Sequence, residues 1–230
     1  MDRYGISKPL ISYHKFKELQ ALDRILEDLE SGKNLALVSD AGTPCINDPG
    51  VHLAAACAKK GIPFTAIPGP CSLVLALVLS AFETDRFQFI GFLPKKQEKT
   101  LRDLLFYPGV TIAFESPERL VSTLTSFEKL VPKRPFAVAR EMTKTYEECR
   151  RGTASELLAH YTEHPPKGEI VLVIGPGDPP EMPLDLEECV ELLREVHGLT
   201  LKEAIKKAAH LLKIPKSAVY KTMHDIPNKH

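Results

Sequence analysis

The chain has 230 residues, 43% of them hydrophobic and 26% charged, which is enough for one large or two small domains with hydrophobic cores. Thirty basic and thirty acidic residues cancel, so the chain lacks the overall positive charge of a dedicated nucleic-acid-binding protein. The longest apolar run, 73–82, is about half the roughly 20 residues that a membrane-spanning helix requires, and the start of the chain has no signal-peptide pattern.

Helical and strand-like patterns alternate along the first part of the chain. Apolar residues recur at helical spacing and stop at Gly32, which predicts an amphipathic helix: Phe16, Leu19, Leu22, Leu26 and Leu29. The apolar run 35–38 then predicts a buried strand. The elements predicted after it are a helix over 51–60, a strand over 63–67, a helix over 72–82 and a strand over 87–90. This alternation predicts an α/β fold with a mostly parallel sheet covered on both faces.

Two loops in this region expose backbone between a strand and a helix. The loop 39–50 reads SDAGTPCINDPG, in which Gly42 has no Cβ and Asp48, followed by a proline, is a good N-cap for the next helix. Asp40 lies at the carboxyl end of a predicted strand, where open α/β sheets bind their ligands. The loop 68–72 has a similar design. Together the loops predict one shared binding cleft.

The segment 91–96, GFLPKK, interrupts the alternation of helix and strand patterns and predicts a domain boundary. An N-terminal α/β domain is then expected over 1–92 and a second one over 93–176. The elements predicted for the second domain are a helix over 98–106, a strand over 110–114, a helix from 116–117, a strand over 136–140, a helix opened by the capping box of Thr153 and Glu156, and a strand over 169–174.

The segment 175–180 is rich in proline and glycine and predicts a linker to a helical C-terminal appendix over 181–230. The helices predicted there span 185–197, 200–212 and 216–224, the second with a capping box at Thr200 and Glu203. Seven lysines face only two acidic residues from Leu199 to the end. This excess is typical of a solvated helix surface or of a patch that contacts phosphates, and the helix pair resembles a helix-turn-helix.

The cysteines do not form a recognisable site. Their number, five, is odd and none of them belongs to a CxxC pair, which disfavours a disulfide framework or a zinc ribbon and favours a reducing cytoplasm. Cys71 occupies the position of a nucleophile elbow, but Leu73 stands where that elbow requires glycine, so a catalytic thiol is disfavoured.

Phosphate-binding and metal-binding motifs are also weak. No GxGxxG follows a predicted strand and no GxxxxGK occurs, which disfavours ordinary dinucleotide and ATP sites. His160, Glu163 and His164 match an H-x-x-E-H string, yet prolines end the helix immediately. Histidines that close a helix at its negative end are the favoured interpretation, and no metal site is expected.

Charged residues gather where predicted strands of the second domain end. The segment 140–144, Arg-Glu-Met-Thr-Lys, follows one strand and Glu115 follows another. Carboxylates and cations at such a place predict a site, with a plain surface ion-pair network as the alternative. The residues expected to face each other across 91–96 are Asp40 and Ser72 from the first domain and Glu115, Glu141 and Glu169 from the second, which predicts an interdomain cleft.

Six segments carry a resemblance to a known family, in this order along the chain: SDAGTPCINDPG, IPGPCS, TDRFQFIGFLPKK, AFESPERL, AREMTKTYEE and GEIVLVI. The chain resembles the ribosomal RNA small subunit methyltransferase I group of the tetrapyrrole methylase superfamily. The resemblance implies two α/β domains, S-adenosylmethionine as cofactor, a homodimer, and 2′-O-methylation of a cytidine in small-subunit ribosomal RNA. The cofactor residues that it implies are Asp40, Gly42, Thr43, Cys71, Ser72, Glu115, Met142 and Glu169.

The chain departs from the family at its front. Family members begin with a further strand and a turn resembling GTPIGNL, whereas this chain starts at MDRYGISKPL. Because the family's opening strand lies inside the sheet, its loss should leave unpaired backbone and an apolar slot. Two interpretations remain open, a true start further upstream or a decayed or repurposed copy.

Methyl transfer to a ribose hydroxyl requires alignment and removal of a proton. Glu141 or a desolvated Lys144 is the expected proton acceptor, and Arg140 is expected to steady a phosphate or the cofactor carboxylate. Two other functions stay open: methylation of a tetrapyrrole or other small acceptor, and a non-enzymatic relic that binds RNA or a partner. The lysine-rich C-terminal segment favours an RNA substrate over a small acceptor.

Overall fold

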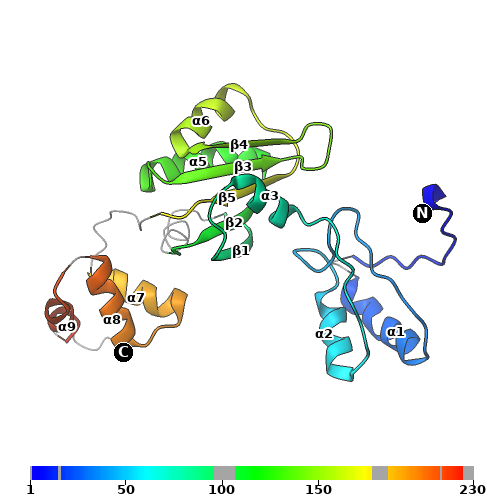
Figure 1. Ribbon diagram of the computed structural model, residues 1–230. Coiled ribbons are helices and arrows are strands. Elements are labelled where there is room, and N and C mark those ends of the chain that lie inside the picture. Colours follow the sequence, from blue (N-terminus) through cyan, green and yellow to red (C-terminus); the bar gives the residue numbers. More distant parts are fainter. Residues whose placement is uncertain (1, 15–16, 96–106, 178–185, 213, 225–230) are drawn as a thin grey trace. The chain divides into compact units, whose positions relative to one another are not determined.

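The computed structural model describes residues 2–14, 17–95, 107–177, 186–212 and 214–224 (Figure 1). The chain divides into two compact units, Met1–Ser72 and Leu73–His230. This division falls before the predicted boundary at 92/93, because the strand that follows the first unit pairs with a strand of the second. Within the described ranges, no helix is both long enough and apolar enough to cross a membrane.

The first unit is built around two helices that pack together, α1 (Glu18–Glu30) and α2 (Val51–Lys60), after a short 3-10 helix η1 (Asp2–Tyr4). The predicted helices 16–29 and 51–60 are confirmed, except that Phe16 lies outside the described residues. Helix α1 buries Ile25 and Leu26, and α2 ends at Gly61 in the left-handed conformation that favours glycine.

The strands predicted over 35–38 and 63–67 do not form. Both segments are irregular, and most of their large apolar side chains are exposed, Val38 by 72% and Ile67 by 85%. A strand is stable only when its backbone groups pair with a neighbour, and neither segment has a strand partner among the described residues. The mostly parallel sheet expected for this part of the chain is therefore wrong.

The second unit contains helix α3 (Ser72–Ser80), most of which belongs to it, and one five-stranded sheet of order β1-β2-β5-β3-β4 (Figure 1). The strands are β1 (Phe87–Phe92), β2 (Val110–Glu115), β3 (Pro135–Arg140), β4 (Glu148–Thr153) and β5 (Ile170–Ile174). Only β1 and β2 pair in parallel, and the other pairs are antiparallel. The sheet is therefore mixed, and β4 is a strand that the sequence did not predict.

Two helices cover this sheet, α5 (Pro117–Leu130) and α6 (Ala154–Glu163), and they pack against each other. The core between them and the strands includes Phe127, Phe136, Leu157, Tyr161 and Leu172. The capping box predicted at Thr153 and Glu156 is confirmed and fixes the start of α6. The helix predicted over 98–106 lies outside the described residues.

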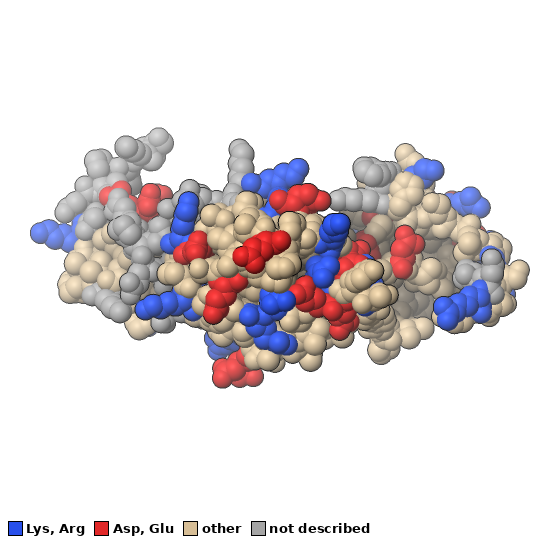
Figure 2. Space-filling view, turned by 90° about the horizontal axis from the view of Figure 1, so that it is seen from above, with Lys and Arg blue, Asp and Glu red and all other residues tan. Residues whose placement is uncertain are grey.

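The last three helices are α7 (Leu186–His197), α8 (Leu201–Leu211) and α9 (Lys216–His224), as predicted. They enclose a core of their own that includes Cys189, Leu193, Ala204, Ala208 and Val219. The capping box at Thr200 and Glu203 is confirmed. Figure 2 shows basic and acidic side chains interspersed over the face in view, in keeping with the balanced composition.

Candidate active site

Strand register places charged residues of the second unit at one end of the sheet, where several strands begin or end. Glu115 at the end of β2 and Arg140 at the end of β3 both pair with Ile170 at the start of β5, and Glu148 of β4 pairs with Arg140. Because β2 and β3 both run antiparallel to β5, their carboxyl ends lie at the same end of the sheet, where β5 begins. The gathering of strand-end charges expected from the sequence is therefore present.

The turn after β3 holds the Glu141 carboxylate in a fixed position. The N–H of Glu141 donates to the Glu169 carbonyl at 3.0 Å, and the N–H of Glu169 donates back to the Glu141 carboxylate at 2.9 Å. Gly168 has φ +86°, and a Cβ there would overlap the Glu141 side chain. Glu141 and Thr143 have φ values of 49° and 66°, a strained conformation for residues other than glycine that is concentrated at functional sites.

Lys144 lies between two carboxylates. Its Nζ donates to Glu141 at 2.9 Å and to Glu169 at 3.0 Å, and 43% of its side chain is exposed. These hydrogen bonds raise the pKa of Lys144 above its ordinary value. A lysine acts as a base only when burial lowers its pKa, so the expected desolvated Lys144 base is wrong, and Lys144 is a charged ammonium.

The Glu141 carboxylate stays ionised in this setting. The hydrogen bond from Lys144 and the one from the Glu169 backbone hold the pKa of Glu141 below its ordinary range. It can therefore accept a hydrogen bond or a proton at neutral pH, although a lowered pKa makes it a weak base.

Glu148 connects two arginines, and the sequence analysis did not single it out. Arg140 contacts one of its carboxylate oxygens at 3.2 Å, and Arg150 contacts the other at 3.0 Å. Arg140 also donates to the Lys167 carbonyl at 3.3 Å. Glu148 belongs to β4, whose sequence ECRRGT has no apolar alternation, and for that reason the pattern did not reveal it.

Glu115 is buried at the end of β2, and its oxygens are occupied. It accepts hydrogen bonds from the Ser116 N–H and the Thr123 hydroxyl, both at 2.7 Å. It also pairs with Arg119 at 2.5 Å. Through these contacts with Thr123 and Arg119, Glu115 joins the end of β2 to α5. Met142, in the turn after β3, is half-buried.

In the first unit the two predicted loops touch each other. The Thr43 hydroxyl donates to the Pro70 carbonyl at 3.0 Å, and a Cβ on Gly42, with φ +73°, would meet the same oxygen at 3.4 Å. Cys45 and Asn47 have positive φ. The Asp40 side chain is exposed and makes no hydrogen bond or ion pair within the described ranges.

At the end of the second loop, Cys71 is a half-buried free thiol and Ser72 begins α3. Residues 40–42 and 68–70 of these loops are exposed, Asp40 among them.

The N-cap predicted for α2 is wrong. Gly50, rather than Asp48, occupies that position, with no capping hydrogen bond from its own residue. The buried Glu18 carboxylate takes the role, accepting from the N–H groups of Gly50 at 2.9 Å and His52 at 3.4 Å. Tyr13 donates to it as well at 3.2 Å.

His160 and His164 close helix α6, as expected, with their rings stacked at a centroid distance of 4.8 Å. In the portion of the chain that the structure describes, no group of three or more His, Cys, Asp or Glu side chains is placed to hold a metal ion.

Comparison with known proteins identifies the class. Residues 12–158 match the family model of Tetrapyrrole (Corrin/Porphyrin) Methylases. The crystal structure of the methyltransferase CobJ has a similar fold, with a TM-score of 0.52 and 19% identity, over 70% of this chain and 72% of that one. The fold and the family model together place the chain among the tetrapyrrole methylases.

Two curated relatives narrow the assignment. A protein of Synechocystis sp. named "Ribosomal RNA small subunit methyltransferase I" is 39% identical over 227 residues, 96% of this chain and 81% of the relative. A protein of Thermotoga maritima with the same name is 40% identical over 76% of this chain and 80% of the relative. The chain belongs to the ribosomal RNA small subunit methyltransferase I family, which confirms the resemblance drawn from its motifs.

Proposed function

We propose that this protein transfers a methyl group from S-adenosylmethionine to small-subunit ribosomal RNA, and that the acceptor is the 2′-hydroxyl of a cytidine. The relatives' names support the RNA substrate. The observation that carries the proposal is backbone strain. Four of the five described non-glycine residues with positive φ, Cys45, Asn47, Glu141 and Thr143, lie in two of the segments whose motifs carry the family resemblance.

We assign cofactor binding to Asp40, Gly42, Thr43, Cys71 and Ser72 of the first unit. The bare backbone of these loops and the available Asp40 carboxylate support this assignment. The cofactor supplies an electrophilic methyl group on a sulfonium.

Met142 and Glu169 of the second unit are proposed to complete this set. Glu169 is suited to it because most of its side chain, 78%, is exposed. Glu115 takes part by holding the strand end, since its own oxygens are occupied.

We propose Arg140 and Glu141 as the catalytic residues and Lys144 as the residue that positions Glu141. Glu141 accepts the proton of the ribose hydroxyl, because it is the carboxylate of the strained turn and is held in place by Glu169. The Lys144 ammonium keeps that carboxylate oriented. Arg140 steadies a phosphate of the RNA through donors that Glu148 leaves available.

A homodimer, which the resemblance implies, and a cytoplasmic location, which the cysteine pattern favours, complete the proposal. Light scattering of the purified protein measures the first part directly, and a mass of twice the 25.6 kDa chain is expected.

The experiment that tests the function is methyl transfer in vitro. Purified protein is incubated with S-adenosylmethionine and either small-subunit or large-subunit ribosomal RNA, and the nucleosides are separated by mass spectrometry. We expect 2′-O-methylcytidine in the small-subunit RNA alone. Methylation of both RNAs, or of a base, would refute the proposed substrate and acceptor.

A further inference from the structure

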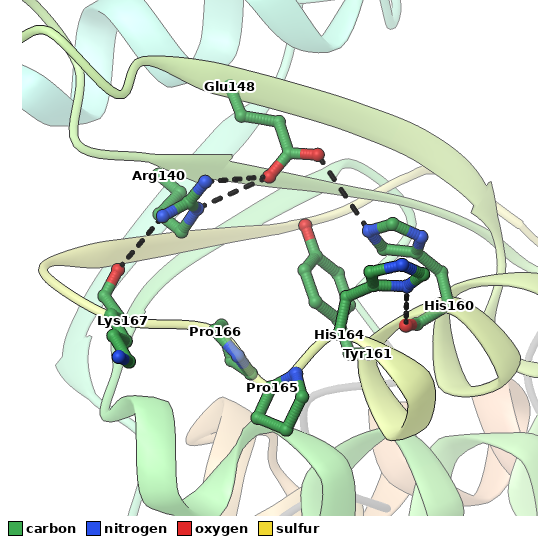
Figure 3. Close-up of a pocket in the computed structure, with 8 residues that line it drawn as sticks. All are labelled: Arg140, Glu148, His160, Tyr161, His164, Pro165, Pro166 and Lys167. Carbon is green, nitrogen blue, oxygen red and sulfur yellow. Dashed lines mark hydrogen bonds and ion pairs between the residues drawn. The ribbon is translucent and has the colours of Figure 1, made fainter.

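A cavity of about 310 Å³ lies beside the candidate active site and takes no part in the mechanism above except through Arg140. It is formed where the end of α6 and the following 165–167 segment face the ends of β3 and β4 (Figure 3). The residues used in the argument below are Arg140, Glu148, His160, Tyr161, His164 and Lys167.

The charges around this cavity do not cancel. Among the lining residues Glu148 is the one carboxylate, and its charge is offset by Arg140 in the cavity and by Arg150, which lies outside the lining. Lys167 adds a further cation whose side chain forms no ion pair with any described residue. The cavity therefore carries an excess of positive charge, which favours an anion as its occupant.

Tyr161 contributes a hydroxyl group without a partner. Its side chain is 1% exposed, and its hydroxyl makes no hydrogen bond within the described part of the chain. In Figure 3 this hydroxyl points toward the Arg140–Glu148 pair. Burial raises the pKa of Tyr161 to about 12, so the group remains a donor. A buried donor left unpaired is destabilising and indicates a missing ion, ligand or water.

His160 of α6 and His164, which follows the end of that helix, add an aromatic face and further donors. Their rings are nearly parallel, with an interplanar angle of 16°, and His164 is exposed. Burial lowers the pKa of His160, and the charges of Arg150 and His164 lower it further, against the opposing effect of Glu148 and Glu163. An anion in the cavity would reverse the effect of those cations. An exposed imidazole face is also a surface on which an RNA base stacks.

We propose that this cavity binds a phosphate group of an RNA nucleotide, with Arg140, Lys167 and the Tyr161 hydroxyl as donors and the His164 ring beside the attached base. The inference rests on the proposed function and extends it by naming a substrate contact next to the Glu141 turn. Because Arg140 precedes Glu141 in the chain, a phosphate held here fixes the RNA backbone close to the group that accepts the proton.

The test uses the full chain and three variants, Tyr161→Phe, Lys167→Ala and, as a matched control outside the cavity, the exposed Lys129→Ala. Affinity for a fluorescent single-stranded RNA is measured by anisotropy, and the His160 resonance is followed by NMR during titration with inorganic phosphate and with the RNA. We expect Tyr161→Phe and Lys167→Ala each to weaken RNA binding by about tenfold, the effect of one charge-assisted hydrogen bond, and Lys129→Ala to have no effect. Tyr161→Phe should leave the unfolding temperature equal or higher, because it removes an unpaired buried group.

In the wild type, phosphate and RNA should both raise the pKa of His160. Unchanged RNA affinity in both cavity variants would overturn the proposal. A response of His160 to phosphate but not to RNA would overturn it as well, in favour of a free phosphate. Methyl transfer is measured on the same preparations. Normal transfer with unchanged affinities rejects the cavity site alone, whereas absent transfer with cavity-dependent RNA binding rejects the proposed function alone.

Discussion

The Glu18 carboxylate caps α2 from another helix, and its removal should destabilise the first unit. Burial acts to raise the pKa of Glu18, but hydrogen bonds from Gly50, Tyr13 and His52 outweigh it and hold that pKa below its ordinary value. We expect Glu18→Gln to reduce the free energy of unfolding at pH 7 by about 2 kcal/mol, as for a charge-assisted hydrogen bond. The measurement is urea denaturation, with the exposed Glu27→Gln as the control.

The effect of Glu18 should depend on pH in a defined direction. A folded-state pKa below the unfolded one gives stabilisation that is present above the ordinary glutamate pKa of about 4.3 and is lost as the pH falls through the lower folded value. The difference between wild type and Glu18→Gln should therefore shrink in acid. A difference that is equal at pH 7 and pH 3 would contradict this account.

Gly168 is predicted to be essential for activity because it has no side chain next to the Glu141 carboxylate, and not because of its backbone flexibility. A methyl group there would overlap the Glu141 carboxylate, so Gly168→Ala should displace that side chain and reduce the methyl-transfer rate at least tenfold. Gly32→Ala is the matched control, since Gly32 has φ +88° and no atom near its Cβ position. Both variants carry similar backbone strain. Equal activities for the two would show that Glu141 does not need its observed position.

Interactions between residues close in the sequence could be predicted from it, and interactions between distant residues could not. The capping boxes at Thr153 and Thr200 depend on residues three positions apart and were found. The Glu18 cap joins residues 32 positions apart, which no local pattern reveals. The charge state of Lys144 was missed for the same reason, because Glu169 is 25 residues away.

At the scale of elements, helix α6 carries two of the cavity residues, His160 and Tyr161, and depends on its capping box. Thr153→Ala should reduce the free energy of unfolding by about 1 kcal/mol, because it leaves an N–H group at the helix start without its acceptor. Thr162→Ala on the same helix is the control, since its hydroxyl donates only to a carbonyl within the helix. Equal stability of the two variants in urea denaturation would count against this role of the cap.

The strands predicted in the second unit are confirmed, including 87–90, which corresponds to the edge strand β1, whereas those predicted over 35–38 and 63–67 are wrong. The runs at 110–114, 136–140 and 169–174 correspond to β2, β3 and β5, which occupy the interior of the sheet. The run 35–38 is also apolar but has no strand partner among the described residues. Strand β4 forms despite its charges because it lies at the edge of the sheet, where β3 alone pairs with it.

At the scale of the whole molecule, the proposed RNA substrate predicts a salt dependence. Exposed lysines of α8, such as Lys202 and Lys206, would contact phosphates in the complex. Replacing these two by alanine should lower the slope of log affinity against log salt by about 0.7 for each lost contact with single-stranded RNA. The control replaces Lys8 and Lys59, exposed lysines of the first unit, and should leave the slope unchanged. An unchanged slope in the first variant would assign those lysines to a solvated surface.

The family could be recognised from motif order although the topology was partly wrong. The six segments run through both units, so they identify the chain without stating how the strands pair. Pairing depends on contacts between distant segments. The apolar pattern therefore did not indicate that β5 lies between β2 and β3 and runs antiparallel to both.

The central claim is that the strained turn containing Glu141 and Lys144 is the catalytic centre. The most direct test measures the rate of methyl transfer by Glu141→Gln and Lys144→Met at saturating S-adenosylmethionine. We predict that Glu141→Gln loses roughly 10²-fold or more in rate, as for removal of a general base, and that Lys144→Met loses a smaller factor. Cofactor affinity, measured by calorimetry, should stay within a few-fold in both. Full methylation of small-subunit RNA by both variants would contradict the account.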